Sequence, residues 1–331
     1  MMTVRMTRRR TIAVLAAAAG LPLALNAGGA RAGMVRWDGT ALGAVASIQL
    51  HHQDEARARA AVDAALSELA RLEAIFSVHR ADSAISALNR DGRLDAAPAE
   101  FVELLQRSLS LAAASEGVYD PTIQPVWMLY FRHFTQRSPN PAGPAAADLA
   151  RAVALVDWRG VHIDGDRVSF AHPGMGLTLN GSAQGYITDR VAEVLRGHGF
   201  DRVLVDMGEP RALAAKPDGS AWRIGIADPS DPTRALTEVS VVDACVATSG
   251  GYGTMFDAAG RFTHLIDPRS GRTAPALEGV SVIAATATAA DGLSTALLLA
   301  PPESRRRLLQ AGGGQRAIYV TPAGVTATVD A

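Results

Sequence analysis

Apolar residues recur at helical spacing in several stretches of the chain. The predicted helices cover residues 54–75, 98–114, 182–198, 291–300 and 302–311. Asp54 is placed to cap the start of the first of them, and Pro98 suits the first turn of the second. Charged residues occupy the opposite face of the first helix, so we expect it to lie at the surface of a globular domain.

Other stretches alternate apolar and polar residues and predict strands. These cover residues 202–206, 222–227, 238–243, 280–285, 316–320 and 325–329. Residues 37–50 are expected to form a strand or a hairpin with a glycine-rich bend, and Asp164-Gly165-Asp166 is typical of a hairpin turn. Helices and strands are mixed without a regular βαβ alternation, which favours an α+β fold.

The first 32 residues have the layout of a cleavable export signal. Consecutive arginines at 8–10 precede an apolar stretch, and Ala30-Arg31-Ala32 offers small residues at the cut site. The arginine pair after Thr7 favours twin-arginine export over the general route. We therefore expect a signal at 1–32 and a mature domain at 33–331, released in the periplasm without stable membrane insertion.

Removal of that signal changes the charge of the chain. The signal carries five arginines and no acidic residue, so the mature part keeps 27 basic against 33 acidic residues, a net charge of −6. This balance argues against a nucleic-acid partner, which needs a basic face. Cys245 is the only cysteine, which excludes an internal disulfide, and no cysteine near the cut site could carry a lipid anchor.

Five clusters of residues could carry chemistry, and the first two combine polar and aromatic side chains. His79 lies in a polar stretch after the first predicted helix, which is typical of a solvated loop and also compatible with a site. Residues 119–131 contain four aromatic side chains in a chain with 5% aromatics. They are equally consistent with a core and with a wall that stacks on a flat ring.

The third and fourth clusters are turns. In residues 178–186, a predicted strand runs through Asn180-Gly181-Ser182 into a helix, whose free N–H groups could cradle a phosphate. This is a weak signal, since the stretch matches neither a Walker loop nor a GxGxxG pattern. The fourth cluster is Thr248-Ser-Gly-Gly-Tyr252, followed by His264 and the turn Asp267-Pro-Arg-Ser-Gly271. The alternative is a plain hairpin with a surface histidine.

The fifth cluster is Ala290-Asp291-Gly-Leu-Ser294-Thr295-Ala296. Asp291 and Thr295 are four residues apart on a predicted helix, and Ser294 lies beside them. One carboxylate and two hydroxyls are oxygen ligands that suit Mg²⁺, which usually keeps phosphate ligands as well. The alternative is an ordinary helix start with solvated hydroxyls.

Taken in order, the five clusters resemble the ApbE family of FAD:protein FMN transferases. The similarity runs from about Gly39 to Pro301, and its most specific segments are GVYDPTIQP, NGSAQGYITD, THLIDPRSG and ADGLSTA. The resemblance implies a T-fold-like α+β architecture, with mixed sheets, packed helices and a cleft for FAD. It also implies Mg²⁺-dependent transfer of FMN from FAD to a threonine or serine of a target flavoprotein, through a phosphoester bond, with release of AMP.

The resemblance also assigns roles to individual residues. It implies metal ligation by Asp291, Ser294, Thr295 and the Gly181 carbonyl, and assistance to the transfer by His264 and Asp291. It implies contacts to FAD from Leu42, His79, Tyr130, Phe131, Arg132, Thr178, Gln184 and Leu265. The expected acceptor carries a site of the Ser/Thr-x-Ala-Thr type.

Two residues depart from the family pattern. Thr178 stands where the family usually has aspartate, and Gln184 where it usually has lysine, which removes a cation from a phosphate-binding region. Gln184, the stretch Asp206-Met-Gly-Glu209 and Arg211 resemble a NosX-like sub-branch linked to nitrous oxide respiration. Two alternatives stay open on sequence: an FAD pyrophosphatase that uses water in place of threonine, and a non-catalytic flavin carrier.

Overall fold

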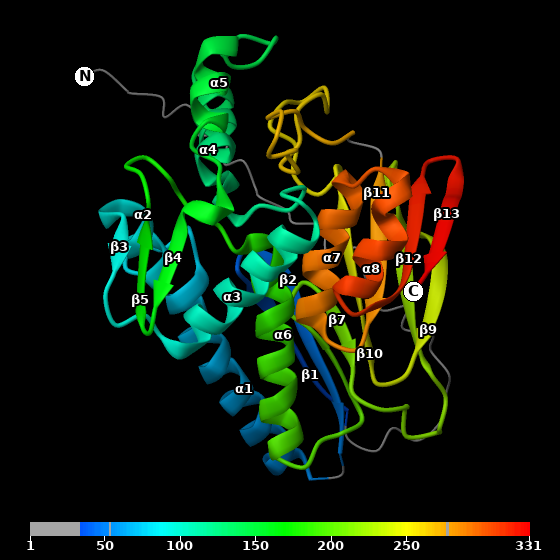
Figure 1. The fold of residues 1–331 in the computed structure, drawn as a ribbon. Helices are drawn as coiled ribbons and strands as arrows, with labels where there is room; N and C mark the ends of the chain where they lie inside the picture. Colours follow the sequence, from blue (N-terminus) through cyan, green and yellow to red (C-terminus); the bar gives the residue numbers. More distant parts are fainter. Residues whose placement is uncertain (1–33, 53, 276–277) are drawn as a thin grey trace, which may run out of the picture.

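The structure, a computed structural model, describes residues 34–52, 54–275 and 278–331 (Figure 1). The predicted export signal at 1–32 lies outside these residues. The strands are β1 (Met34–Ala41), β2 (Ala44–His51), β3 (Arg93–Leu94), β4 (Val161–Asp164), β5 (Arg167–Phe170), β6 (Val203–Asp206), β7 (Pro210–Ala212), β8 (Trp222–Asp228), β9 (Asp231–Val241), β10 (Ala244–Gly250), β11 (Gly279–Ala284), β12 (Gly314–Thr321) and β13 (Gly324–Asp330). The α-helices are α1 (Glu55–Phe76), α2 (Ala84–Asp91), α3 (Ala99–Ala114), α4 (Gln124–Phe134), α5 (Ala146–Val153), α6 (Asn180–Gly197), α7 (Ala287–Leu299) and α8 (Arg305–Ala311).

An eight-stranded antiparallel sheet organises the molecule, in the order β1-β2-β6-β7-β10-β11-β12-β13. Strand β2 pairs with β6 in the register Ser47↔Asp206, which joins the N-terminal hairpin to the middle of the chain. A small sheet β3-β5-β4 and the ribbon β8-β9 complete the strands of the described residues. The predicted α+β class is confirmed, since these pairings are antiparallel and no βαβ unit organises the sheet.

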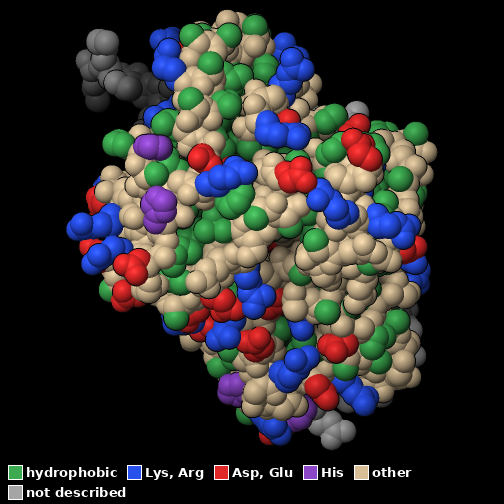
Figure 2. Space-filling model, viewed as in Figure 1, with side chains coloured by type: hydrophobic (Ala, Val, Ile, Leu, Met, Phe, Trp, Pro, Cys, Tyr) green, Lys and Arg blue, Asp and Glu red, His purple; other side chains and the backbone are tan. Residues whose placement is uncertain are grey.

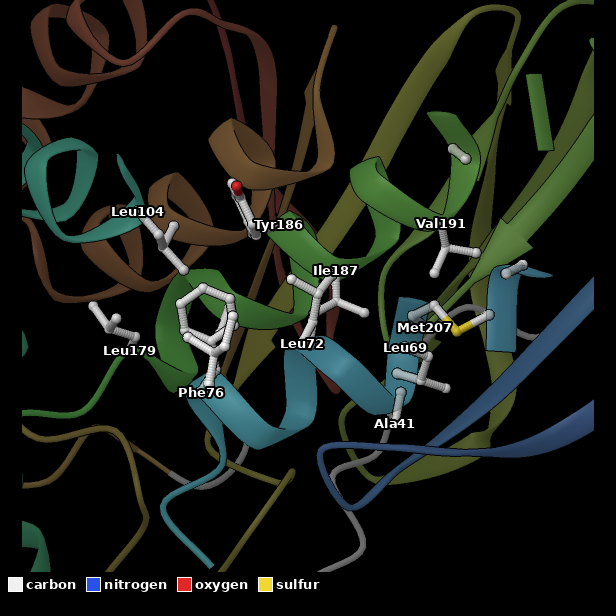
Figure 3. Packing of buried hydrophobic residues seen from close by; sticks show 14 of the residues in the cluster. Ala41, Leu69, Leu72, Phe76, Leu104, Leu179, Tyr186, Ile187, Val191 and Met207 are labelled. Carbon is white, nitrogen blue, oxygen red and sulfur yellow. The ribbon is translucent and has the colours of Figure 1, made fainter. Parts of the chain in front are cut away.

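Helices α1, α6, α7 and α8 cover one face of the sheet (Figure 1), and each packs against the next in this order. Figure 3 shows the core between α1 and α6, where Leu69, Leu72 and Phe76 face Ile187 and other apolar residues of α6. Apolar residues recur on one side of α1 with helical period, so packing this side against α6 excludes water from both helices. Asp54 caps α1 by accepting the Arg57 N–H, as its position predicts.

The N-terminal hairpin is confirmed, and its turn strains one residue. Leu42 and Gly43 join β1 to β2 and have φ of 47° and 87°. Two-residue hairpin turns with positive φ at both positions match the twist of the strands, but a leucine rarely adopts such a φ. The Leu42 N–H donates to Glu73 Oε1 at 2.8 Å, which anchors the turn to α1.

Basic and acidic side chains are interspersed over the face seen in Figure 2, without a continuous basic patch. In the part of the chain that the structure describes, no helix is long and apolar enough to span a bilayer.

Candidate active site

A cavity opens where the start of α6, the side of α7 and four loops meet. Its wall includes the β1–β2 turn, the β6–β7 turn, the end of β10 and the loop at 253–268. The residues from the five sequence clusters that line it are His79, Tyr119, Asp120, Pro121, Trp127, Thr178, Asn180, Gly181, Gln184, Thr248, Ser249, Gly250, His264, Leu265, Pro268, Asp291 and Thr295. All five clusters therefore contribute to one cavity, although they are far apart in sequence.

The contact between α6 and α7 is unusually close and places Asp291. A Cβ on Gly185 would lie 2.2 Å from the Ala287 carbonyl oxygen and 2.8 Å from Asp291 Cβ, so only glycine fits. At this contact, the Gly185 N–H donates to Asp291 Oδ2 at 2.9 Å. Asp291 is 4% exposed, and its burial raises its pKa.

The Asp189 side chain of α6 caps the first turn of α7 and holds it in place. The Asp189 carboxylate accepts the N–H groups of Ala287 and Thr288, both at 2.9 Å, and the Thr288 hydroxyl at 2.6 Å. Arg211 donates to the same carboxylate at 2.6 Å and to the Ala285 carbonyl at 3.0 Å. A carboxylate at a helix N-terminus is stabilised by the unpaired N–H groups there.

Thr295 lies on the cavity side of α7, one turn after Asp291. A Cβ on Gly181 would be 3.3 Å from Thr295 Oγ1, so the backbone of α6 approaches this hydroxyl directly. Ser249 Oγ lies 3.0 Å from Thr295 Oγ1 and 2.8 Å from Ser294 Oγ. Ser249 thus belongs to the wall, although sequence reasoning gave it no role.

Ser294 does not share that position. Its side chain is fully buried, donates to the Asp291 carbonyl at 2.9 Å and does not line the cavity. A residue at i+3 is rotated about 100° from one at i+4 along a helix, which turns Ser294 toward β10. Ser249 Oγ contacts both hydroxyls, so Ser294 and Thr295 lie close together, but only Thr295 lines the cavity with Asp291.

Glu209 is a cavity residue that sequence reasoning used only as a sub-branch marker. It is 6% exposed, and its Oε2 accepts the Thr248 N–H at 3.2 Å. Burial, followed by the negative charges of Asp291 and Asp206, raises its pKa. Burial also raises the pKa of Asp206 to about 7. The place of Glu209 in a turn between two short buried strands was the signal in the sequence that could have marked it as a site residue.

His264 reaches the cavity from the loop between β10 and β11. The Thr254 N–H donates to its Nδ1 at 3.2 Å, and the Thr254 carbonyl oxygen lies 3.1 Å from the same nitrogen, where it can accept if the tautomer carries a proton on Nδ1. Burial lowers the pKa of His264, partly offset by this backbone contact, so the ring is neutral at pH 7. The tautomer decides between these two contacts: where Nδ1–H donates to the carbonyl, Nε2 keeps a lone pair and can accept a proton.

The aromatic cluster is divided between the core and the cavity wall, since Tyr119 and Trp127 line the cavity whereas Tyr130 and Phe131 do not. Tyr130 is buried, stacks on Phe256 with centroids 5.6 Å apart and donates its hydroxyl to the Gly271 carbonyl at 2.8 Å. Phe131 stacks on Trp127 with centroids 5.3 Å apart, and of these rings only that of Trp127 lines the cavity. These contacts hold the His264 loop against α4.

Three of the residues expected to contact FAD therefore lie away from the cavity: Tyr130, Phe131 and Arg132. They belong to a helix, α4 (Gln124–Phe134), that the sequence analysis did not predict. The start of this helix faces the cavity through Gln124 and Trp127, while its later turns pack on the loop. Arg132 is exposed. The other expected contacts line the cavity: Leu42, His79, Thr178, Gln184 and Leu265.

Comparison with known proteins identifies the family. The sequence model of the ApbE family matches residues 42–319. The chain belongs to the ApbE family. It is 32% identical over 295 residues to the FAD:protein FMN transferase of Treponema pallidum, covering 80% of this chain and 79% of that protein.

Solved structures of the ApbE family share the fold. The apo flavinyl transferase ApbE of Pseudomonas stutzeri superposes with a TM-score of 0.73 at 29% identity, over 90% of this chain and 94% of that one. The flavin transferase ApbE of Vibrio cholerae superposes with a TM-score of 0.75 at 23% identity, over 90% and 97%. The predicted ApbE fold is thus confirmed, and the chain belongs to a family of flavin-transferring enzymes.

The cavity of this ApbE chain is acidic at one end. Glu209 and Asp291 line it, and Asp120, whose carboxylate accepts hydrogen bonds from Thr122 and Trp158, is a third acidic lining residue. No Lys or Arg is among the lining residues in the described part of the chain. No group of three or more His, Cys, Asp or Glu side chains that could hold a metal occurs among these residues. A cation here would therefore depend on carboxylate, hydroxyl and carbonyl oxygens, the ligand types that Mg²⁺ accepts.

Proposed function

We propose that this chain transfers FMN from FAD to a threonine or serine of a target flavoprotein. The acceptor oxygen bonds to the phosphorus on the FMN side of the pyrophosphate, the bond from that phosphorus to the bridging oxygen breaks, and AMP leaves. The hydroxyl proton passes to a base on the enzyme. The observation that carries the proposal is the convergence of Asp291, Thr295, Gly181 and His264 on one cavity of an ApbE chain.

The residues at the acidic end fit Mg²⁺. Asp291 and Thr295 line the cavity from α7, and the backbone of Gly181 faces them from α6. Bound there, Mg²⁺ would stabilise the charge of the pyrophosphate and of the leaving AMP. The first turn of α6 adds backbone N–H groups at the cavity wall, which favour anionic oxygens.

His264 is the candidate base. Burial keeps the ring neutral at pH 7, and the Thr254 backbone fixes its orientation through Nδ1. A neutral imidazole in this orientation can take the proton of an acceptor hydroxyl through Nε2. The aromatic contacts of Tyr130 and Phe256 hold the loop that carries it.

The decisive variant is Asp291→Ala. Incubated with FAD, Mg²⁺ and an acceptor that carries a Ser/Thr-x-Ala-Thr site, it should give no product, seen as in-gel flavin fluorescence and an acceptor mass increase of FMN minus water. Asp63→Ala, which removes an exposed carboxylate of α1, is the charge-matched control and should retain activity. Transfer by Asp291→Ala at the wild-type rate would refute the metal assignment.

Measurement of AMP separates this reaction from its alternatives. A transferase releases AMP only when the acceptor is present. Release of AMP and FMN without acceptor would identify an FAD pyrophosphatase. Tight FAD binding without turnover on any acceptor would identify a flavin carrier.

We also propose where the enzyme works and on what. Residues 1–32 would direct twin-arginine export, and residues 33–331 would act in the periplasm. The stretch Asp206-Met-Gly-Glu209, with Gln184 and Arg211, supports a NosX-like role, in which the acceptor is a membrane-bound flavoprotein of nitrous oxide respiration. Replacing Arg8 and Arg9 by lysine should leave the precursor in the cytoplasm, and unchanged periplasmic activity would refute the twin-arginine route.

A further inference from the structure

Glu209 is held in the cavity wall opposite α7 by the β6–β7 turn. Asp206 pairs with Pro210, and Gly208 between them has a φ of 107°, which favours glycine. The Gly208 N–H donates to Asp206 Oδ1 at 3.0 Å, which fixes the turn from inside. The fold therefore places the Glu209 carboxylate in the wall, with 6% of the residue exposed.

The hydrogen bonds of Glu209 and Asp291 leave each carboxylate incomplete. Within the described residues, Glu209 accepts one hydrogen bond, from the Thr248 N–H, on Oε2. Asp291 also accepts one, from the Gly185 N–H, on Oδ2. The second oxygen of each side chain has no donor there, and the cavity wall contains no Lys or Arg. Buried carboxylates are costly without a positive partner, so this end of the cavity is suited to a cation.

The end of β10 connects Glu209 to the proposed cation ligands. Thr248 binds Glu209 through its N–H, and the next residue, Ser249, lies 3.0 Å from the Thr295 hydroxyl. Two consecutive residues of one strand thus contact both Glu209 and Thr295.

We propose that Glu209 is a ligand of the divalent cation in this chain, together with Asp291, Thr295 and the Gly181 carbonyl. This inference rests on the proposed Mg²⁺-dependent function and adds a second carboxylate to it. Mg²⁺ is usually bound by one or two carboxylates together with substrate phosphates. Two carboxylates balance the charge of the cation, so here the cation can bind without the charge of those phosphates. The consequence is that this chain binds its cation before FAD arrives.

Titration of the flavin-free, full mature chain with Mn²⁺ tests this directly. Electron paramagnetic resonance reports free Mn²⁺, and competition with Mg²⁺ then gives the Mg²⁺ affinity. We expect one Mn²⁺ per wild-type chain without FAD. Glu209→Gln keeps the size of the side chain and an acceptor for the Thr248 N–H, and should weaken binding at least about tenfold, since even the loss of partners of metal ligands costs about 10–100-fold.

Two further variants make the result specific. Glu303→Gln makes the same chemical change at an exposed site and should bind as wild type does. Glu209→Asp keeps the charge and should retain part of the affinity that Glu209→Gln loses. Melting curves in EDTA establish that each variant is folded, and if Glu209→Gln is unfolded, Glu209→Asp decides the question by its weaker binding.

The outcomes separate this inference from the proposed function. The role of Glu209 alone is overturned if folded Glu209→Gln binds Mn²⁺ as tightly as wild type while Asp291→Asn loses binding. Where Glu209→Gln is unfolded, the same comparison is made with Glu209→Asp. Unchanged affinity in both Glu209→Gln and Asp291→Asn overturns the cation site itself. Wild-type chain that binds no Mn²⁺ without FAD also overturns the inference, because a site with two carboxylates should not need the pyrophosphate.

Discussion

The contact between α6 and α7 at Gly185 gives the sharpest prediction of stability. The Cβ of Gly185→Ala would lie 2.2 Å from the oxygen and 2.5 Å from the carbon of the Ala287 carbonyl, and 2.8 Å from Asp291 Cβ. The obstacle is backbone, which cannot rotate aside as a side chain can, so the helices must separate by about 1 Å to restore ordinary contact. Overpacking costs about 1–3 kcal/mol, and we expect the upper end of this range.

The separation also weakens the bond from the Gly185 N–H to Asp291. A hydrogen bond to a charged group contributes about 1.5–3 kcal/mol, and part of this is included in the same loss. Flavin transfer should fall as well, because Asp291 moves with α7. Urea unfolding followed by circular dichroism measures the stability, and the fluorescence assay measures the activity.

Gly197→Ala provides the matched control at the far end of the same helix. A Cβ at Gly197 meets nothing within 4 Å, and its φ is not positive. Alanine is a better helix former than glycine, so this variant should be as stable as wild type or more stable by up to about 1 kcal/mol. The refuting result is a free energy of unfolding of Gly185→Ala within about 0.5 kcal/mol of the wild-type value, a difference no larger than the helix-propensity effect. The two helices would then not approach as closely as described.

Three further predictions test the Asp189 cap of α7, the candidate base His264 and the loop that carries His264. Asp189→Asn should lose about 3–5 kcal/mol, since it breaks a buried ion pair and a helix cap, while the exposed Asp148→Asn should lose at most about 1 kcal/mol; equal urea midpoints would contradict this. Burial lowers the pKa of His264 in the folded protein, so near and below about pH 6.5 the unfolded chain binds a proton at this residue more readily than the folded protein does. The free energy of unfolding of wild type should therefore fall relative to that of His264→Gln between about pH 8 and 5.5, and a pH-independent difference between the two would refute the assignment. Tyr130→Phe should cost about 1–3 kcal/mol because it leaves the Gly271 carbonyl without its donor, as thermal unfolding would measure, and an unchanged midpoint would remove this bond from the loop's support.

The sequence predicted the elements with strong periodicity and missed those without it. The helix from Asp54 and the hairpin over 37–50 were predicted because capping, spacing and glycines all agree there. Strand β10 was missed because it is short, mostly buried and rich in small residues, so no alternation marks it. Helix α4 was missed because its aromatic residues were interpreted as core or as a wall for a flat ring, and not by their helical spacing.

The candidate site divides in the same way. Asp291 and Thr295 were placed on one face by local helix geometry, which depends only on sequence spacing. Glu209 was not found, because its position depends on the pairing of β6 with β7 and on the packing of α6 against α7. Ser294 shows the limit of spacing alone, since rotation of about 100° turned it to the buried side.

The order of strands in the large sheet has a consequence for how the molecule folds. Strands β10 to β13 are neighbours in both sequence and sheet. Strand β2 instead pairs with β6, and the paired residues Ser47 and Asp206 are separated by about half the chain. Local contacts form faster than distant ones, so we expect the C-terminal strands with α7 to assemble early and the N-terminal hairpin to join late. Because the cavity lies where these two parts meet, newly made chains should acquire the ability to bind a ligand only in the last step of folding.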